Sequence, residues 1–174
     1  MEKLEIIQYI LEDEELIFFL PKTIRAQDAY SMYKYAEKLL QEKQPRMLLV
    51  DLSSTEYMDS TTIGTFLKLR SWMKAHGGSF FIANINKESA RILREMHLYD
   101  YFNHFTNDLL AQIKKHVCNN LPQIDKNKLA AWYIKDAHEC LIKAAPQLKE
   151  SFLPLLKALQ SKIAASQENV AHKH

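Results

Sequence analysis

The sequence predicts an α/β fold: a mixed central sheet of four to five strands flanked by helices, followed by a C-terminal helical extension. Two observations support this class. Short apolar runs alternate with segments of helical period as far as residue 117, which is typical of strands joined by crossover helices. Beyond a break at residues 118–125, every apolar pattern has helical spacing. The chain is therefore expected to divide into a sheet domain, residues 1–118, and an extension, residues 119–174.

The first elements are a hairpin, a helix and a strand. Two apolar runs within residues 4–20 are separated by an acidic turn at 12–15, which predicts a β-hairpin. Apolar residues over 29–40 fall on one face of a helix. The continuous apolar run at 47–50 predicts a strand buried on both faces of a sheet.

A second helix is expected to begin at Ser60 and to end at the glycine pair 77–78, because glycine is common just past the end of a helix. Ser60 itself is expected to cap this helix through its hydroxyl. The remaining elements of the sheet domain are a buried strand over 79–85, a helix over 87–98, a short extended segment at 101–105 and a helix over 109–117.

The extension contains two apolar stripes of helical period, over residues 129–141 and 148–163. Pro146 is a suitable first residue for the second helix, and Pro154 is expected to kink or restart it. The tail from Ser166 is expected to fray. These stripes either cover the sheet domain, pair with a second copy of the chain in a homodimer, or form a separate partner-binding module.

Composition excludes several classes of function. The 23 basic and 21 acidic residues give a net charge of +2 without a long basic block, so no nucleic-acid surface is expected. No apolar run is long enough to predict a membrane span. Three glycines are too few for a phosphate-binding loop, and two cysteines are too few for a disulfide framework. We therefore expect a cytoplasmic protein that contacts neither membrane nor nucleic acid.

The histidines do not predict a metal site. His97, His104 and His116 lack the paired spacing of metal ligands, and His138 and Cys140 stand only two residues apart on a predicted helix. Exposed or hydrogen-bonded histidines are the simpler interpretation. No cofactor and no enzymatic activity are expected, because the sequence offers neither a nucleophile–base pair nor a set of metal ligands.

The segment 47–64 reads MLLVDLSSTEYMDSTTIG. It resembles the central motif of the STAS family, and most closely that of the bacterial anti-sigma factor antagonists, in which a buried strand ends in Asp-Leu-Ser and the chain returns through an aromatic residue and Met-Asp-Ser into a helix. The match continues through the glycine pair and the strand at 80–84 to the helix end at 96–102. The resemblance covers residues 4–117.

The resemblance implies a function by partner switching. In the family, the serine after Met-Asp is phosphorylated by a Ser/Thr kinase that also acts as an anti-sigma factor, and a metal-dependent Ser/Thr phosphatase removes the phosphate. Here that serine is Ser60. The predicted partner-binding residues around it are Asp51, Asp59, Thr61, Thr62, Leu69 and Trp72. Leu69 and Trp72 are large apolar residues on the flank of the second helix, so we expect the C-terminal helices to dock there and cover them.

Two departures from the family pattern leave alternatives open. Thr62 stands where the family usually has glycine, and the segment 20–24 lacks the Gly-x-Leu-Asp of members that bind such kinases. Ser60 could therefore cap its helix without being modified, in a STAS scaffold or a regulatory module of a sensor kinase. Thr61 and Thr62 are the alternative phosphoacceptors. A phosphoaspartate at Asp51 is a further alternative, although the accompanying acidic residues of such sites are missing.

Overall fold

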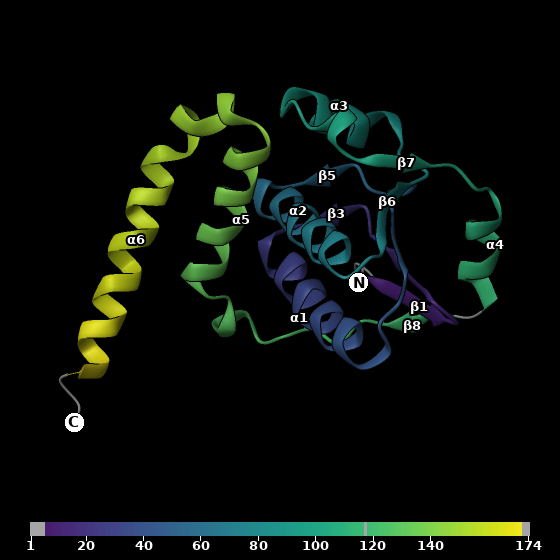
Figure 1. Cartoon of the computed structure of the whole chain (residues 1–174), viewed down its shortest axis with the longest axis horizontal. Coiled ribbons are helices and arrows are strands. Elements are labelled where there is room, and N and C mark those ends of the chain that lie inside the picture. Colours follow the sequence, from purple (N-terminus) through teal and green to yellow (C-terminus); the bar gives the residue numbers. More distant parts are fainter. Residues whose placement is uncertain (1–5, 117, 172–174) are drawn as a thin grey trace, which may run out of the picture.

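Strands and helices alternate through the first two thirds of the chain (Figure 1). The computed structural model describes residues 6–116 and 118–171, so the ends of the predicted elements at residues 4–5 and 117 and the last part of the tail, 172–174, lie outside the described residues. The strands are β1 (Gln8–Glu12), β2 (Glu15–Phe19), β3 (Thr23–Ile24), β4 (Met47–Asp51), β5 (Tyr57–Met58), β6 (Ser79–Ala83), β7 (Asn103–Phe105) and β8 (Asn119–Asn120). The α-helices are α1 (Ala26–Lys43), α2 (Ser60–Ala75), α3 (Lys87–Glu95), α4 (Leu109–His116), α5 (Ala131–Ala144) and α6 (Lys149–Ala171).

The main sheet has six strands in the order β7-β6-β4-β2-β1-β8. β1 and β2 form the predicted antiparallel hairpin, with Glu12 opposite Glu15 at the turn. β2, β4, β6 and β7 are parallel and are joined by crossovers through α1, α2 and α3. The α/β class is confirmed. The sheet exceeds the expected four to five strands because Asn119 and Asn120 also pair with β1. These two residues lie just past the domain boundary expected at residue 118, which stays a prediction.

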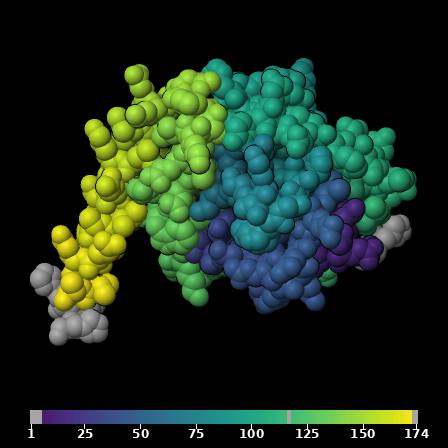
Figure 2. Space-filling model, in the orientation of Figure 1, coloured from purple at the N-terminus to yellow at the C-terminus, as the bar shows by residue number. Residues whose placement is uncertain are grey.

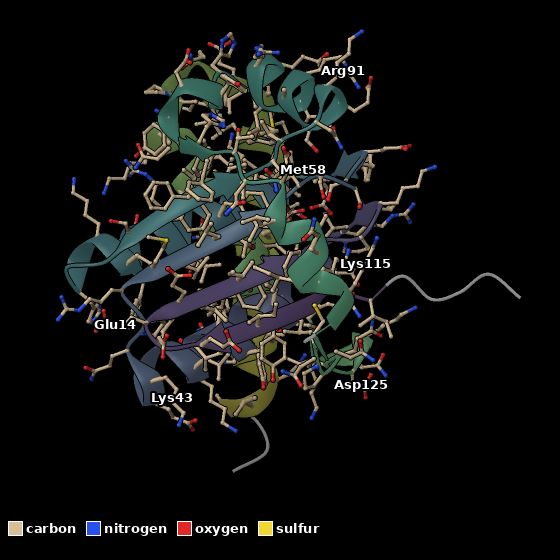
Figure 3. The ribbon with its side chains drawn as sticks, turned by 90° about the vertical axis from the view of Figure 1, so that its right-hand side faces the viewer. Glu14, Lys43, Met58, Arg91, Lys115 and Asp125 are labelled. Carbon is tan, nitrogen blue, oxygen red and sulfur yellow. The ribbon has the colours of Figure 1, made fainter. Side chains whose placement is uncertain are left out.

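Alternate residues of the central strands face two separate hydrophobic clusters. In β2, Leu16 and Phe18 belong to the cluster covered by α1, α2 and α3, whereas Ile17 and Phe19 belong to the cluster on the other face. Helix α4 lies over the second face, which Figure 3 views with Lys115 of α4 in front of the strands. Burial on both faces explains the continuous apolar runs from which these strands were predicted.

A second, two-stranded sheet determines where α1 and α2 begin. β3 and β5 pair in parallel, with Ile24 opposite Met58. Each of these strands leads into a helix, β3 into α1 and β5 into α2, and the amide of Ala26 donates a hydrogen bond to Asp59. The N-termini of α1 and α2 are therefore held side by side, with Ser60 as the first residue of α2.

The extension packs against the sheet domain. Helix α5 lies on α2, where the C-terminal helices were predicted to dock, and α6 lies on the outer side of α5 (Figures 1 and 2). α5 also contacts α1, because the ring of Tyr133 lies 4.8 Å from that of Tyr30 and 5.3 Å from that of Tyr33. α5 therefore packs against both of the first two helices of the sheet domain.

Helix α6 continues through Pro154 to Ala171, so the proline does not restart the helix. A proline in the second turn removes only the hydrogen bond to the carbonyl of Glu150, which lies in the first turn and remains accessible to water. The helix includes Ser166 and the residues after it, within the stretch expected to fray. Across residues 6–116 and 118–171, no helix combines the length and the apolar character needed to cross a membrane.

Candidate functional site: the N-terminus of helix α2

Asp51 lies at the carboxyl end of β4 and is buried. Its Oδ1 accepts hydrogen bonds from the backbone amide and the hydroxyl of Ser53, and its Oδ2 accepts one from Asn84 Nδ2 at 2.8 Å. The carboxylate thus fixes the loop after β4 and links it to the residue that follows β6. Both oxygens are bonded within the protein, and the partner-binding role expected of Asp51 stays a prediction.

Asp59, not Ser60, is the N-cap of α2. Its Oδ1 accepts hydrogen bonds from the amide of Thr62 at 2.9 Å and from the Thr62 hydroxyl at 2.8 Å. Its Oδ2 accepts the bond from Ala26 at 2.7 Å. The predicted capping role of Ser60 is therefore wrong, since the longer acidic side chain one residue earlier already satisfies the free amide of the first turn.

The hydroxyl of Ser60 instead contacts His138 of α5, with Oγ 2.8 Å from Nε2. The other ring nitrogen, Nδ1, lies 2.7 Å from the carbonyl oxygen of Ile134. A carbonyl oxygen can only accept, so Nδ1 carries a proton and donates it. In the neutral ring Nε2 is then an acceptor, and the Ser60 hydroxyl donates to it.

His138 is held in its neutral form by its surroundings. The side chain is 1% exposed, and the ring of Phe152 from α6 packs edge-on against it at 4.8 Å between centroids. Burial lowers the pKa of His138 below its ordinary value of 6.5, against the opposite effects of the Ile134 carbonyl and the charge of Asp59. The hydroxyl of a partly exposed serine therefore meets a buried, neutral imidazole.

Gly64 brings α2 and α5 into backbone contact one turn beyond Ser60. A Cβ atom at this position would lie 2.4 Å from the carbonyl oxygen of Ala137 and 2.8 Å from its Cβ. Such distances are far below van der Waals contact, so a side chain at residue 64 requires α5 to move away. Gly64, the last residue of the MDSTTIG segment, is thus a point where the backbones of α2 and α5 approach each other closely.

Polar contacts continue along the same face of α2. The hydroxyl of Thr65 donates to the carbonyl of Thr61, so the Tyr133 hydroxyl donates to Thr65. Burial raises the pKa of Tyr133, which keeps this phenol protonated. Further on, Lys68 Nζ lies 3.4 Å from Asp136 Oδ2 and 5.1 Å from the centre of the Tyr133 ring.

With this geometry established, comparison with known proteins identifies the family. A family model described as the STAS domain matches residues 5–112, more than half of the chain. The chain belongs to the STAS domain family. The match ends before α5 and α6, so His138 lies in the extension, outside the matched STAS domain.

Three solved structures share the STAS fold at low sequence identity. The anti-sigma factor antagonist SpoIIAA in its unphosphorylated form has 11% identity and a TM-score of 0.54, covering 65% of this chain and 99% of its own. TM1081 of Thermotoga maritima has 19% identity and a TM-score of 0.52, with coverage of 62% and 91%. A variant of RsbS from Moorella thermoacetica has 17% identity and a TM-score of 0.51, with coverage of 62% and 93%. These similarities confirm the fold that the sequence predicts.

The predicted partner-binding residues of the STAS domain occupy different environments. Asp59 and Ser60 are partly exposed, whereas Thr61, Thr62 and Leu69 are buried. Their roles toward a partner stay predictions. Because Thr61, Thr62 and Leu69 are buried in this structure, they would affect a partner indirectly, by fixing the conformation of α2.

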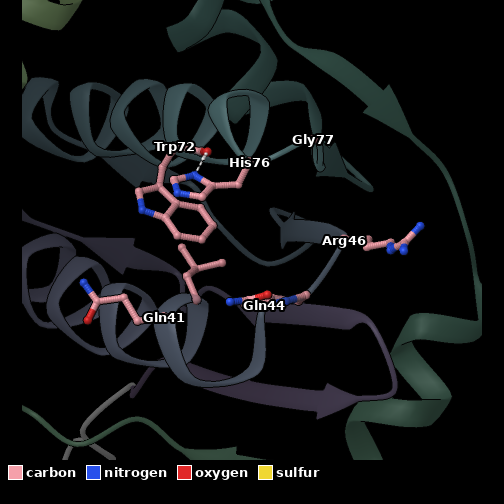
Figure 4. Close-up of a pocket in the computed structure, with 8 residues that line it drawn as sticks. Gln41, Gln44, Arg46, Trp72, His76 and Gly77 are labelled. Carbon is pink, nitrogen blue, oxygen red and sulfur yellow. Dashed lines mark hydrogen bonds between the residues drawn. The ribbon is translucent and has the colours of Figure 1, made fainter.

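Trp72 lies near the opposite end of α2, far from Ser60. Its indole stacks on His76 at 3.8 Å between ring centres, and both residues line a pocket of about 630 Å³ together with Gln41 and Arg46 (Figure 4). Trp72 also borders a second hollow with Cys140 of α5 but remains partly exposed. The cover expected over Trp72 is therefore incomplete, whereas the extension packs tightly against α2 at Gly64.

Proposed function

We propose that this STAS protein is a non-enzymatic signalling switch of the anti-sigma factor antagonist type, controlled by reversible phosphorylation of Ser60. One observation carries the proposal. Ser60 is the first residue of α2 and has a partly exposed side chain, whereas the neighbouring hydroxyl residues Thr61 and Thr62 are buried. Among the three, Ser60 is the residue that a kinase can reach with the smallest rearrangement.

The electrostatics of the helix start support modification at this residue. A phosphoserine carries about −1.5 to −2 charges at neutral pH, and the N-terminus of a helix favours negative charge because its first amides point outward. The same charge would stand beside Asp59, which already caps the helix. A partner that docks on the unmodified surface with acidic or apolar groups would then be repelled.

The proposed partners follow from the family and from one structural relative. SpoIIAA is described as an anti-sigma factor antagonist in an unphosphorylated form, and this supports a Ser/Thr kinase of the anti-sigma type as the partner that binds and modifies this chain. A metal-dependent Ser/Thr phosphatase would reverse the modification. A second copy of the chain, docked on the C-terminal helices, is a further partner in this proposal.

A STAS scaffold that is never phosphorylated is the second candidate. The hydrogen bond between Ser60 and His138 favours it, because the bond gives the Ser60 hydroxyl a structural role within the chain. The same pair resembles a nucleophile and its base, but a substrate would have to displace α5 to reach a ring that is 1% exposed. We therefore place the chain among binding proteins and not among hydrolases.

Intact-mass analysis of the protein from its native cells, grown with and without stress, tests the proposal. We expect a species heavier by one phosphoryl group in one condition, with the phosphate on Ser60, and its loss in a Ser60→Ala strain. Phosphate that appears as readily in Ser60→Ala would make the assignment to Ser60 wrong. Unmodified protein in every condition would favour the scaffold.

A further inference from the structure

The extension contacts Ser60, the residue on which the proposed switch depends. Helix α5 contacts the N-terminal half of α2 through three successive points, at Ser60, Gly64 and Thr65, and α6 supports His138 from behind through Phe152. These contacts come from a part of the chain outside the matched STAS domain.

We propose that α5 is a removable cover over Ser60, and that docking of α5 and phosphorylation of Ser60 exclude each other. The proposal rests on the proposed function, in which Ser60 is the phosphoacceptor. It assigns the extension a role in regulating that same residue: the docked extension keeps the switch unmodified, and a modified switch keeps the extension released.

The first step of the argument is access. A kinase transfers a phosphoryl group to a hydroxyl oxygen that is aligned with the leaving group of ATP. In the docked protein the Ser60 hydroxyl points at His138 Nε2, and the imidazole is buried, with Phe152 of α6 packed edge-on against it. The hydroxyl can turn toward a kinase only if it leaves Nε2 buried without a partner, or if α5 withdraws. Withdrawal restores water to both groups.

The second step is charge. A phosphate on Ser60 would face the carboxylate of Asp59 on one side and a neutral imidazole on the other. Lys68, a cation at this interface, is paired with Asp136 and lies about two turns along α2 from Ser60, roughly 12 Å by helix rise. The docked geometry therefore holds the phosphate between a negative charge and a buried ring that carries no charge to balance it.

The third step is that α5 can move as a unit. The segment before it is anchored to α1, because Gln27 Nε2 donates to the carbonyl of Ile124 and the amide of Ile124 donates to Ser31. The interface includes hydrogen bonds and an ion pair that water can replace, together with the buried side chains of Tyr133, Ala137 and Leu141. Its release leaves the strand pairs of the main sheet in place, because neither α5 nor α6 contributes a strand. Local opening of α5 and α6 is then easier than unfolding the sheet, and the tether keeps the released helices close by.

Site-specific incorporation of phosphoserine tests this without requiring the cognate kinase. Full-length protein is prepared with phosphoserine at position 60, with phosphoserine at position 54 as a control, and unmodified. Ser54 is exposed in the loop after β4 and provides the same charge at the same end of the sheet. Amide hydrogen exchange is followed in α5 and in β4, and the reaction of Cys140 with a thiol reagent is followed in a Cys118→Ser background.

We expect phosphoserine at position 60 to speed exchange in α5 and labelling of Cys140 by about tenfold or more, a size usual for coupling between two sites. Protection in β4 and the behaviour of the position-54 control should match the unmodified protein. Unchanged α5 protection would overturn the proposal, as would equal effects at position 54 or a parallel loss of protection in β4. Absence of phosphate on Ser60 in native cells would instead refute the proposed function and leave this coupling measurable.

Discussion

The two sides of Ser60 are built differently. On one side, Asp51 and Asp59 accept hydrogen bonds within the STAS domain, from the loop after β4, from Asn84 after β6, and from the first turns of α1 and α2. On the other side, Ser60, Gly64 and Thr65 meet helix α5, some 70 residues later in the sequence. The hydrogen bonds of Asp51 and Asp59 fix the backbone before and at the start of α2, and we call this part the frame. Helix α5, which contacts the Ser60 side chain, is the cover. Because the frame does not depend on α5, the cover can be released while the STAS domain stays folded.

The largest expected effect on the free energy of unfolding is at Gly64, where α2 contacts α5. Gly64→Ala places a methyl group 2.4 Å from the Ala137 carbonyl, so we expect it to reduce the free energy of unfolding by about 3 kcal/mol, at the upper end for overpacking. Alanine in an exposed helix would instead stabilise it by about 1 kcal/mol. Urea unfolding, with Lys74→Ala on the exposed face of α2 as control, measures the difference. A more stable Gly64→Ala protein would contradict the close contact.

A substitution at Asp59, in the frame, should affect the starts of α1 and α2 and not α5. Asp59→Ala removes the N-cap of α2 and the bond to Ala26, so we expect a loss of about 2 kcal/mol. Asp59→Asn keeps an accepting oxygen and should lose much less. Hydrogen exchange should accelerate at the N-termini of both α1 and α2. Faster exchange confined to α5 would mean that frame and cover are not distinct.

Tyr133 tests the polar part of the cover. Tyr133→Phe removes the hydroxyl that donates to Thr65, while Thr65 keeps its bond to the Thr61 carbonyl. We expect a loss of about 1 kcal/mol, typical of one buried hydrogen bond. Thr65→Val and the double variant complete a cycle that isolates the coupling between the two side chains. Additive single effects would show that the two hydroxyl groups do not interact.

The smallest effect is a dependence of docking on pH. In the docked protein burial lowers the pKa of His138 below 6.5, and release of α5 returns it toward that value. Well above pH 6.5 the ring is neutral in both forms, and docking does not depend on pH. As the pH falls below 6.5, the released form binds a proton that the docked form does not, so docking weakens. Asp59 faces the ring from the start of α2 and opposes this shift, and Phe152 faces it from α6 without charge.

Amide exchange in α5, corrected for the pH dependence of the intrinsic exchange rates, checks this prediction. It is measured from about pH 7.5 to about pH 5.5, a range that brackets the ordinary histidine pKa of roughly 6.5. His138→Gln, which has no titrating ring, should remove the dependence. Docking that strengthens toward low pH would mean that His138 is stabilised in its charged form by the contact.

Local patterns were sufficient to predict most of the frame. The hairpin, the buried strands and the start of α2 each depend on residues close in sequence, and MDS at 58–60 marks the switch. The Ser60–His138 pair could not be predicted in this way, because the two residues are 78 positions apart and a lone histidine on a helix has no distinctive spacing. The cap was assigned to the wrong residue for a related reason: Asp59 and Ser60 are both favoured at N-caps, and only the geometry separates them.

One signal for the cover was present in the sequence. Gly64 lies inside a predicted helix, where glycine is unfavourable by about 1 kcal/mol unless a close approach requires it. Together with the apolar stripe over 129–141, it would have indicated a helix packed against this face of α2. Leu69 and Trp72, which suggested docking instead, lie in the core and at a pocket at the far end of the helix.

The occupancy of phosphate on Ser60 in native cells, compared between wild type and Gly64→Ala, tests the central claim most directly. Gly64→Ala releases the cover without altering Ser60, Asp59 or His138, and Lys74→Ala serves as the matched control on the same helix. Intact mass and peptide mapping give the phosphorylated fraction. The account predicts a higher fraction at Ser60 in Gly64→Ala than in wild type and Lys74→Ala. An equal or lower fraction in Gly64→Ala would contradict it.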